Sequence, residues 1–172
     1  MFNMELKTLR PINDYKVKEC NSREYDDELD DGRAVIADIC EIFDDTKEVI
    51  FKVSGFGEEN WAVDCRFDLP VIVEQLPEIL GKIDNSDFNF TLDFYEQGIE
   101  RELEFLESAD FVSLKCISRN NWVPATDRIE MKKEDICKIF KNLYQNFLSY
   151  SEVLCKDLAN HILLKDWMEI KQ

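Results

Sequence analysis

The stretch from Phe88 to Ile117 reads FNFTLDFYEQGIERELEFLESADFVSLKCI, and it decides the fold class. Its first part, Phe88 to Phe94, alternates apolar and polar residues, which is the period-two pattern of a β-strand with one buried face. The alternation continues from Ile99 to Phe105 and again from Phe111 to Ile117. Gly98 ends a short polar turn between the first two runs. We therefore expect three consecutive antiparallel strands, a β-meander.

The middle strand of this meander carries a row of acidic residues. Glu100, Glu102 and Glu104 occupy alternate positions, so strand geometry points their carboxylates to one side of the sheet. Adjacent like charges repel one another unless bases on a neighbouring strand or a partner offset them, and Lys115 lies one strand later. Two interpretations stay open: a solvated face that prevents association of the sheet, and an acidic patch that faces a partner.

A second meander is expected before this one. Residues 34–43 (AVIADICEIF) are rich in β-forming residues and, with residues 48–53, predict a hairpin. The alternation over residues 61–66 predicts its third strand, with Trp61 on the inward face. Residues 5–9 predict a short edge strand. The three strands at residues 34–43, 48–53 and 61–66 would then lie in one antiparallel sheet.

Two helices follow from apolar spacing. Asp68-Leu69-Pro70 predicts a helix start, with Asp68 as the N-cap and Pro70 in the first turn. Apolar residues recur at helical spacing from Ile136 to Leu154, which predicts a long amphipathic helix. The expected fold is α+β: mainly antiparallel sheet in two β-meanders, a short helix after the first, and a long C-terminal helix packed on one face.

The length of 172 residues suits a single domain spanning residues 1–172. Within it, the acidic run 24–31 predicts a flexible loop, because a dense series of like charges repels itself. No stretch has the apolar length of a signal peptide or a membrane span, so a cytoplasmic location is expected. The six cysteines have no Cys-x-x-Cys spacing, which favours reduced thiols in the core.

Charge is the strongest feature of the composition. The chain has 37 acidic and 21 basic residues, a net charge of −16, and residues 1–110 alone hold 29 acidic and 11 basic residues. Such a field repels nucleic acid and anionic lipid and attracts a basic protein. Acidity that serves only solubility is the competing interpretation.

The residue patterns of common catalytic sites are missing. The single histidine, His161, leaves no imidazole for a nucleophile elsewhere, and Gly55-Phe56-Gly57 lacks the third glycine and the following helix of a phosphate loop. Asp64 with Asp68 remains a possible Mg²⁺ or acid–base pair, as does a group of Asp93, Glu96 and Glu100. We expect no cofactor and no enzyme activity, with a carboxylate-dependent metalloenzyme as the alternative.

Two phrases carry a family resemblance, the residues WAVDCRFDL at 61–69 and LDFYEQGIER at 92–101. In them the chain resembles small acidic bacterial proteins of uncharacterised families, some of which are regarded as immunity proteins of polymorphic toxin systems. The resemblance implies a cytoplasmic protein that binds and blocks one toxin domain, often a basic nuclease, without catalysis of its own.

The sequence therefore predicts an interaction protein whose acidic surface holds a basic partner, such as the toxin domain that the resemblance implies. A DNA mimic or regulatory subunit is a further alternative, because rows of carboxylates can imitate phosphates. Trp61, Tyr95 and Trp122 lie at strand starts or turns, where binding anchors often occur. The predicted partner-binding residues are Asp93, Glu96, Glu100, Glu102, Glu104 and Trp122.

Overall fold

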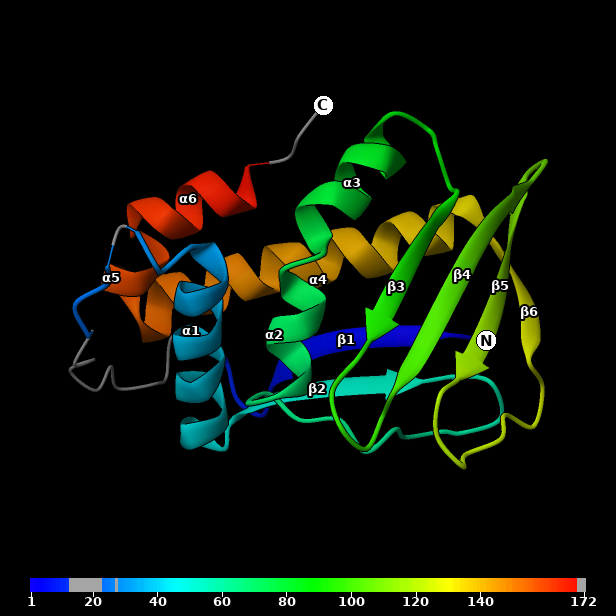
Figure 1. Cartoon of the computed structure of the whole chain (residues 1–172), viewed down its shortest axis with the longest axis horizontal. Helices are drawn as coiled ribbons and strands as arrows, with labels where there is room; N and C mark the ends of the chain where they lie inside the picture. The colour runs from blue at the N-terminus through cyan, green and yellow to red at the C-terminus, as the bar shows by residue number, and fades with distance from the viewer. Residues whose placement is uncertain (13–22, 27, 170–172) are drawn as a thin grey trace.

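The computed structural model describes residues 1–12, 23–26 and 28–169. Its six strands form two antiparallel sheets, its longest helix runs from one end of the molecule to the larger sheet, and its other helices spread from that end to the middle (Figure 1). The strands are β1 (Asn3–Thr8), β2 (Val49–Ser54), β3 (Phe90–Phe94), β4 (Arg101–Ser108), β5 (Phe111–Ser118) and β6 (Arg128–Lys132). The helices are α1 (Gly32–Thr46), α2 (Asp68–Val73), α3 (Leu76–Asp84), α4 (Lys133–Leu154), α5 (Lys156–Ala159) and α6 (Ile162–Met168).

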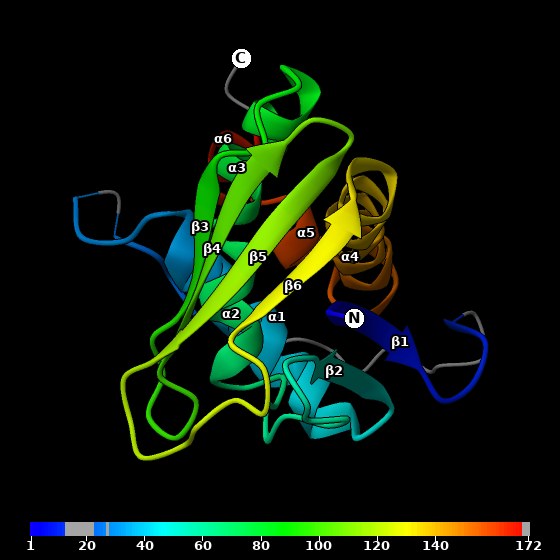
Figure 2. The ribbon, with the colours of Figure 1, turned by 90° about the vertical axis from the view of Figure 1, so that its right-hand side faces the viewer.

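The larger sheet has the strand order β3-β4-β5-β6, so each strand pairs with its neighbour in sequence. Helix α4 packs against β5 and β6 on its inner face and α2 against β3, and no helix of the described residues lies over the opposite face, which is turned towards the viewer in Figure 2. The smaller sheet, β1-β2, packs against α4 through β1. The fold is therefore α+β with antiparallel sheets and a long C-terminal helix, as the sequence predicts.

Aromatic side chains join the layers. Phe90 and Phe105 stack on adjacent strands with their ring centroids 4.5 Å apart, and both rings contact Phe140 of α4 edge-on. Phe2, from the smaller sheet, meets Phe105 of the larger one at 6.4 Å. Burial of these rings holds both sheets and α4 around one hydrophobic core.

The meander predicted from Phe88 to Ile117 is confirmed as β3, β4 and β5, and β6 extends it by one strand. The predicted long helix is confirmed as α4, which begins three residues earlier than the apolar spacing indicated. The short edge strand is present as β1. Trp61 is 1% exposed, which confirms the prediction that it lies in the core.

The strand predicted at residues 34–43 is wrong, because these residues form most of helix α1. The Asp31 side chain accepts a hydrogen bond from the Arg33 N–H and caps the helix. The residues that face the core are spaced as on one side of a helix, so tertiary packing outweighs the β preference of valine and isoleucine. They are Val35, Ile36, Ile39, Cys40 and Phe43.

The third strand predicted at residues 61–66 is also wrong: these residues form turns, and the smaller sheet has only two strands. Asp68 is not the N-cap of α2, since Phe67 occupies that position without a side-chain cap. The Asp68 Oδ2 instead accepts a hydrogen bond from the Asp64 N–H at 2.9 Å. The apolar spacing after Asp68 is real, but it divides between α2 and α3.

A candidate partner-binding surface

The predicted acidic row lies on the uncovered face of the larger sheet, where the protein's own bases pair with it. The Arg119 Nη2 lies 2.7 Å from both Asp93 Oδ2 and Glu102 Oε2. The Lys115 Nζ lies 3.3 Å from Glu104 Oε2. Strand register explains the second pair, because Glu104 and Lys115 are directly opposite each other on β4 and β5.

Charge on this uncovered face is balanced as a whole. The strand pairings place four acidic and three basic residues on it, and Arg119 adds a fourth base through its ion pairs, so it has no net field to attract a basic partner over a distance. The acidic ones are Asp93, Glu102, Glu104 and Glu130, and the basic ones are Lys115, Arg119, Arg128 and Lys132.

The six predicted binding residues do not come together at one place. Glu100 precedes β4 with a left-handed backbone (φ 45°), outside the strand, so it does not continue the row. Glu96 lies in the turn after β3, close enough to Asp68 to contribute to raising its pKa. Trp122 is partly buried and packs on the hydrophobic core.

Trp122 covers a buried arginine, Arg101. The alternation along β4 places Arg101 on the inner face of the sheet, but it does not explain why a charged residue lies there. Arg101 is 3% exposed, and its guanidinium carbon lies 3.5 Å from the Trp122 ring centre and 4.2 Å from that of Trp61. Its Nη1 forms an ion pair with Glu58 Oε2 at 2.9 Å, off the line of a hydrogen bond. A cation held between two rings next to a carboxylate fixes the 119–127 loop to the core.

The excess of negative charge lies elsewhere, on α1 and the residues just before it. Residues 23–48 hold eleven acidic and three basic residues, a net charge of −8. Two bases from outside this range, Arg66 and Arg10, pair with Glu41 and Glu48. Counting them leaves the region with a net charge of −6. We call residues 23–48 the acidic segment; within it, Asp27 lies outside the described residues.

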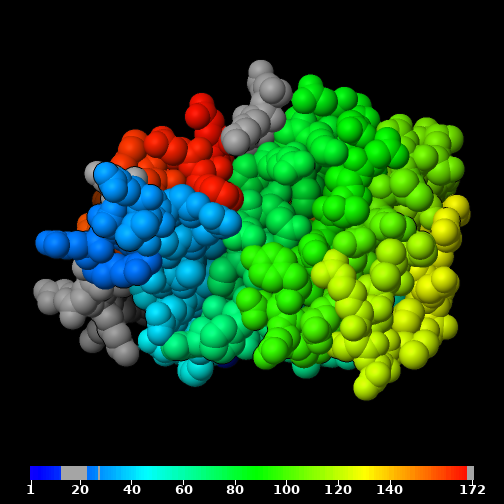
Figure 3. All heavy atoms as spheres, viewed as in Figure 1, coloured from blue at the N-terminus to red at the C-terminus, as the bar shows by residue number. Residues whose placement is uncertain are grey.

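The acidic segment lies on an exposed face. Figure 3 shows it in blue and cyan, directly beside the green surface formed by α2, α3 and β3. Near its start, Arg23 bonds to Asp30 and Asp38, and Tyr25 donates a 2.6 Å hydrogen bond to Asp38. These bonds attach the described part of the predicted acidic loop to α1.

The carboxylates of Asp64 and Asp68, the predicted acid–base or metal pair, accept backbone hydrogen bonds. Asp64 Oδ1 accepts from the Phe67 N–H at 2.7 Å, and Asp68 accepts from the Asp64 N–H. Burial, and then the nearby carboxylates of Asp64 and Glu96, raise the pKa of Asp68 to about 6. Among the described residues no group of three or more His, Cys, Asp or Glu side chains is arranged to hold a metal ion.

The nucleophilic side chains lie in structural positions. Burial raises the pKa of Cys65 to about 12 and that of Cys116 to about 11, so both are neutral thiols at physiological pH. Cys40 is fully buried, as predicted, and Cys137 is half-buried; Cys20 lies outside the described residues. His161 caps α6 through its Nδ1, which accepts from the Leu163 N–H, and its ring packs at a tilt against the Tyr25 ring, with the ring centroids 4.8 Å apart.

Comparison with protein families, with curated proteins and with solved structures returned no match. The resemblance to immunity proteins therefore stays a prediction. No helix in the described part of the chain has the length and apolar character needed to span a bilayer.

Proposed function

We propose that this protein is a non-catalytic binding protein of the cytoplasm that neutralises a basic protein partner, in the manner of the immunity proteins it resembles. The observation that carries the proposal is the uneven distribution of charge in the folded chain. The sheet face is balanced, whereas the acidic segment keeps a net charge of −6 after its ion pairs are counted.

A net charge of this size acts on a partner before the two proteins touch. An uncompensated negative region raises the local concentration of a basic partner and speeds its association, and added salt screens the effect. The ion pairs inside the segment are exposed, so each contributes little to folding stability. The net charge costs stability through self-repulsion, and a binding role gives a reason for its retention.

The proposal is tested by capture from the lysate of the source organism with the immobilised full-length chain at low salt. We expect a basic protein that elutes as salt is raised and whose own activity, once the protein is purified, is blocked by a stoichiometric amount of this chain. An acidic or neutral partner, or a basic one whose activity is unchanged in the complex, would contradict the proposal.

A further inference from the structure

Phe67 is an exposed aromatic residue on a rigid turn. Its side chain is 59% exposed, although its backbone is fixed by two carboxylates. Asp64 Oδ1 accepts the Phe67 N–H, and Asp68 accepts the Asp64 N–H. A ring carried on a backbone that is already ordered adds little backbone-ordering cost when a partner covers it, which is a property of binding anchors.

Tyr95, in the turn after β3, is held in a similar way. It is 47% exposed, and its hydroxyl group donates a 2.7 Å hydrogen bond to Glu74 Oε1 at the end of α2. The Tyr95 hydroxyl therefore lies at the C-cap of α2, whose N-cap is Phe67, and β3, the strand before Tyr95, packs against α2. The two exposed rings thus stand at the two ends of α2.

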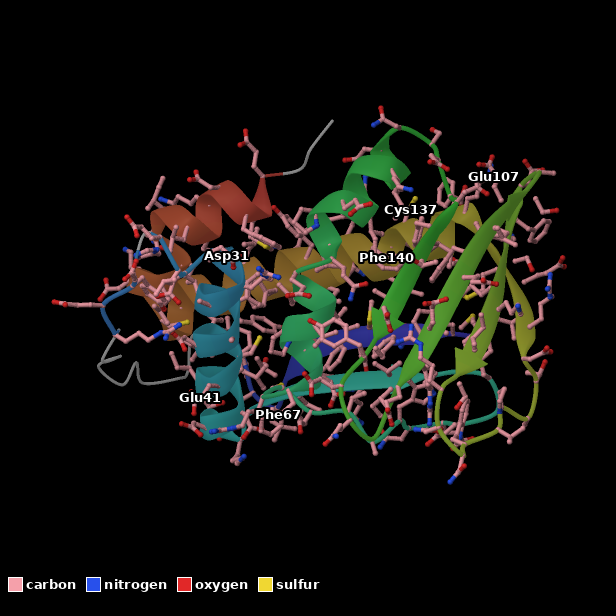
Figure 4. The ribbon with its side chains drawn as sticks, in the orientation of Figure 1. Asp31, Glu41, Phe67, Glu107, Cys137 and Phe140 are labelled. Atoms are coloured by element: carbon pink, nitrogen blue, oxygen red, sulfur yellow. The ribbon has the colours of Figure 1, made fainter. Side chains whose placement is uncertain are left out.

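Acidic side chains lie beside each aromatic, Glu74 at Tyr95 and others near Phe67. Glu41 and Asp45, on the last turns of α1, each lie 2.7 Å from a guanidinium nitrogen of Arg66, the residue that precedes Phe67. Figure 4 places Glu41 and Phe67 next to each other at the lower end of α1. Arg33, at the start of α1, opposes the rise in the Tyr95 pKa that burial and Glu74 cause, but it is already paired with Asp31 and lies over Trp167.

Resting on the proposed function, we infer that these side chains are the docking surface for the basic partner and take its arginine residues. We call this the aromatic–acid surface, formed by Glu41, Asp45, Asp64, Phe67, Tyr95 and Glu96. An arginine stacks its planar guanidinium on an aromatic ring and pairs its edge with a carboxylate at the same time. Four carboxylates against Arg66 leave charge for more than one arginine.

The chain offers a matched control on its other face. Leu106 and Phe111 are 47% and 44% exposed, similar to Tyr95, but they lie on the uncovered sheet face, where charge is balanced. They have the apolar area of the proposed anchors without the surrounding negative charge. Comparing replacement of Phe67 and Tyr95 with replacement of Leu106 and Phe111 therefore distinguishes a specific docking surface from nonspecific apolar binding.

The test is an NMR titration of the isotopically labelled full-length chain with a short Arg-Gly repeat peptide at low salt, with the Lys-Gly repeat as comparison. We expect shifts concentrated at residues 41–45, 64–68 and 95–96, and tighter binding of the arginine peptide. Phe67→Ala with Tyr95→Ala should weaken binding about fivefold to thirtyfold. Phe67→Tyr with Tyr95→Phe, which keeps both rings, should restore most of it.

Equal weakening by Leu106→Ala with Phe111→Ala would overturn the inference, as would shifts confined to the sheet face. Shifts confined to residues 23–31 would also overturn it while leaving the proposed function intact, because the acidic segment would then act without the aromatics. Absence of binding by either peptide would count against the aromatic–acid surface, and the proposed function would then depend on the capture experiment alone.

Discussion

Replacing Asp68 with Asn should stabilise this protein, and the gain should depend on pH. Asp68 is 6% exposed, and burial is the main cause that raises its pKa from 3.8 to about 6. An asparagine has nearly the same shape and keeps an oxygen to accept the Asp64 N–H. Asp68→Asn therefore removes a buried charge without removing its hydrogen bond.

The sign follows from where protons bind. A carboxyl group whose folded-state pKa is raised holds its proton more tightly in the native state, so its unfavourable contribution grows as pH rises from about 4 and is complete above about 6. A shift of about two pKa units corresponds to about 3 kcal/mol at pH 8, and roughly half of that applies at pH 5. The advantage of Asp68→Asn should follow the same curve.

Urea unfolding of both proteins, monitored by tryptophan fluorescence at pH 5 and pH 8, measures this difference directly. Taking the variant minus the wild type cancels the titrating groups that do not interact with Asp68. A difference that does not change between the two pH values would refute the reasoning, and so would a variant that is less stable than the wild type at pH 8.

Two further substitutions test how the core is held together. Arg101→Met should destabilise the fold by about 3–5 kcal/mol, because it leaves the buried Glu58 Oε2 without a cation. Adding Glu58→Gln should recover a large part of that loss. Urea midpoints of the single and double variants measure this, and a double variant no more stable than the single one would contradict it. Gly32→Ala should destabilise the fold by about 1–3 kcal/mol, because the new Cβ would lie 2.1 Å from the Trp167 Cβ and displace α6. Calorimetry measures the loss of stability, and an unchanged melting temperature would show that α1 and α6 are not so closely packed.

Local patterns predicted the second half of the fold well. From Phe88 onward, strict alternation and short turns leave one reasonable structure, and β3, β4 and β5 follow it. The same alternation placed Arg101 on the inner face, where a charged residue is unusual. Its two tryptophan neighbours are 40 and 21 residues away, so no local pattern reveals the cluster.

The first half misled for identifiable reasons. Residues 34–43 have high β propensity, but Asp31 supplies a cap and the buried positions repeat at helical spacing. Trp61 and Cys65 are both buried without a strand between them, because turns bring them to the core. Short apolar runs do not distinguish these cases, and contacts distant in sequence decide them.

The charge prediction was correct in sign but not in place. Three glutamates on alternate residues predict a row, yet Glu102 is paired with Arg119, which lies 17 residues later and beyond the next strand. Such pairing depends on strand register and loop path. The acidic segment, treated from sequence as a flexible loop and a strand, becomes instead one continuous charged region because 32–46 is a helix.

The most direct test of the account is the association rate of the captured basic partner, measured by stopped flow over a series of salt concentrations. Two double variants each remove two carboxylates that are paired with a base of this chain: Glu41→Gln with Asp45→Asn on α1, and Glu102→Gln with Glu104→Gln on the sheet. We predict a rate that falls by about tenfold or more as salt is raised, with a clear reduction at low salt for the α1 pair alone. A rate independent of salt, or an equal loss in both variants, would contradict the claim that the acidic segment steers the partner.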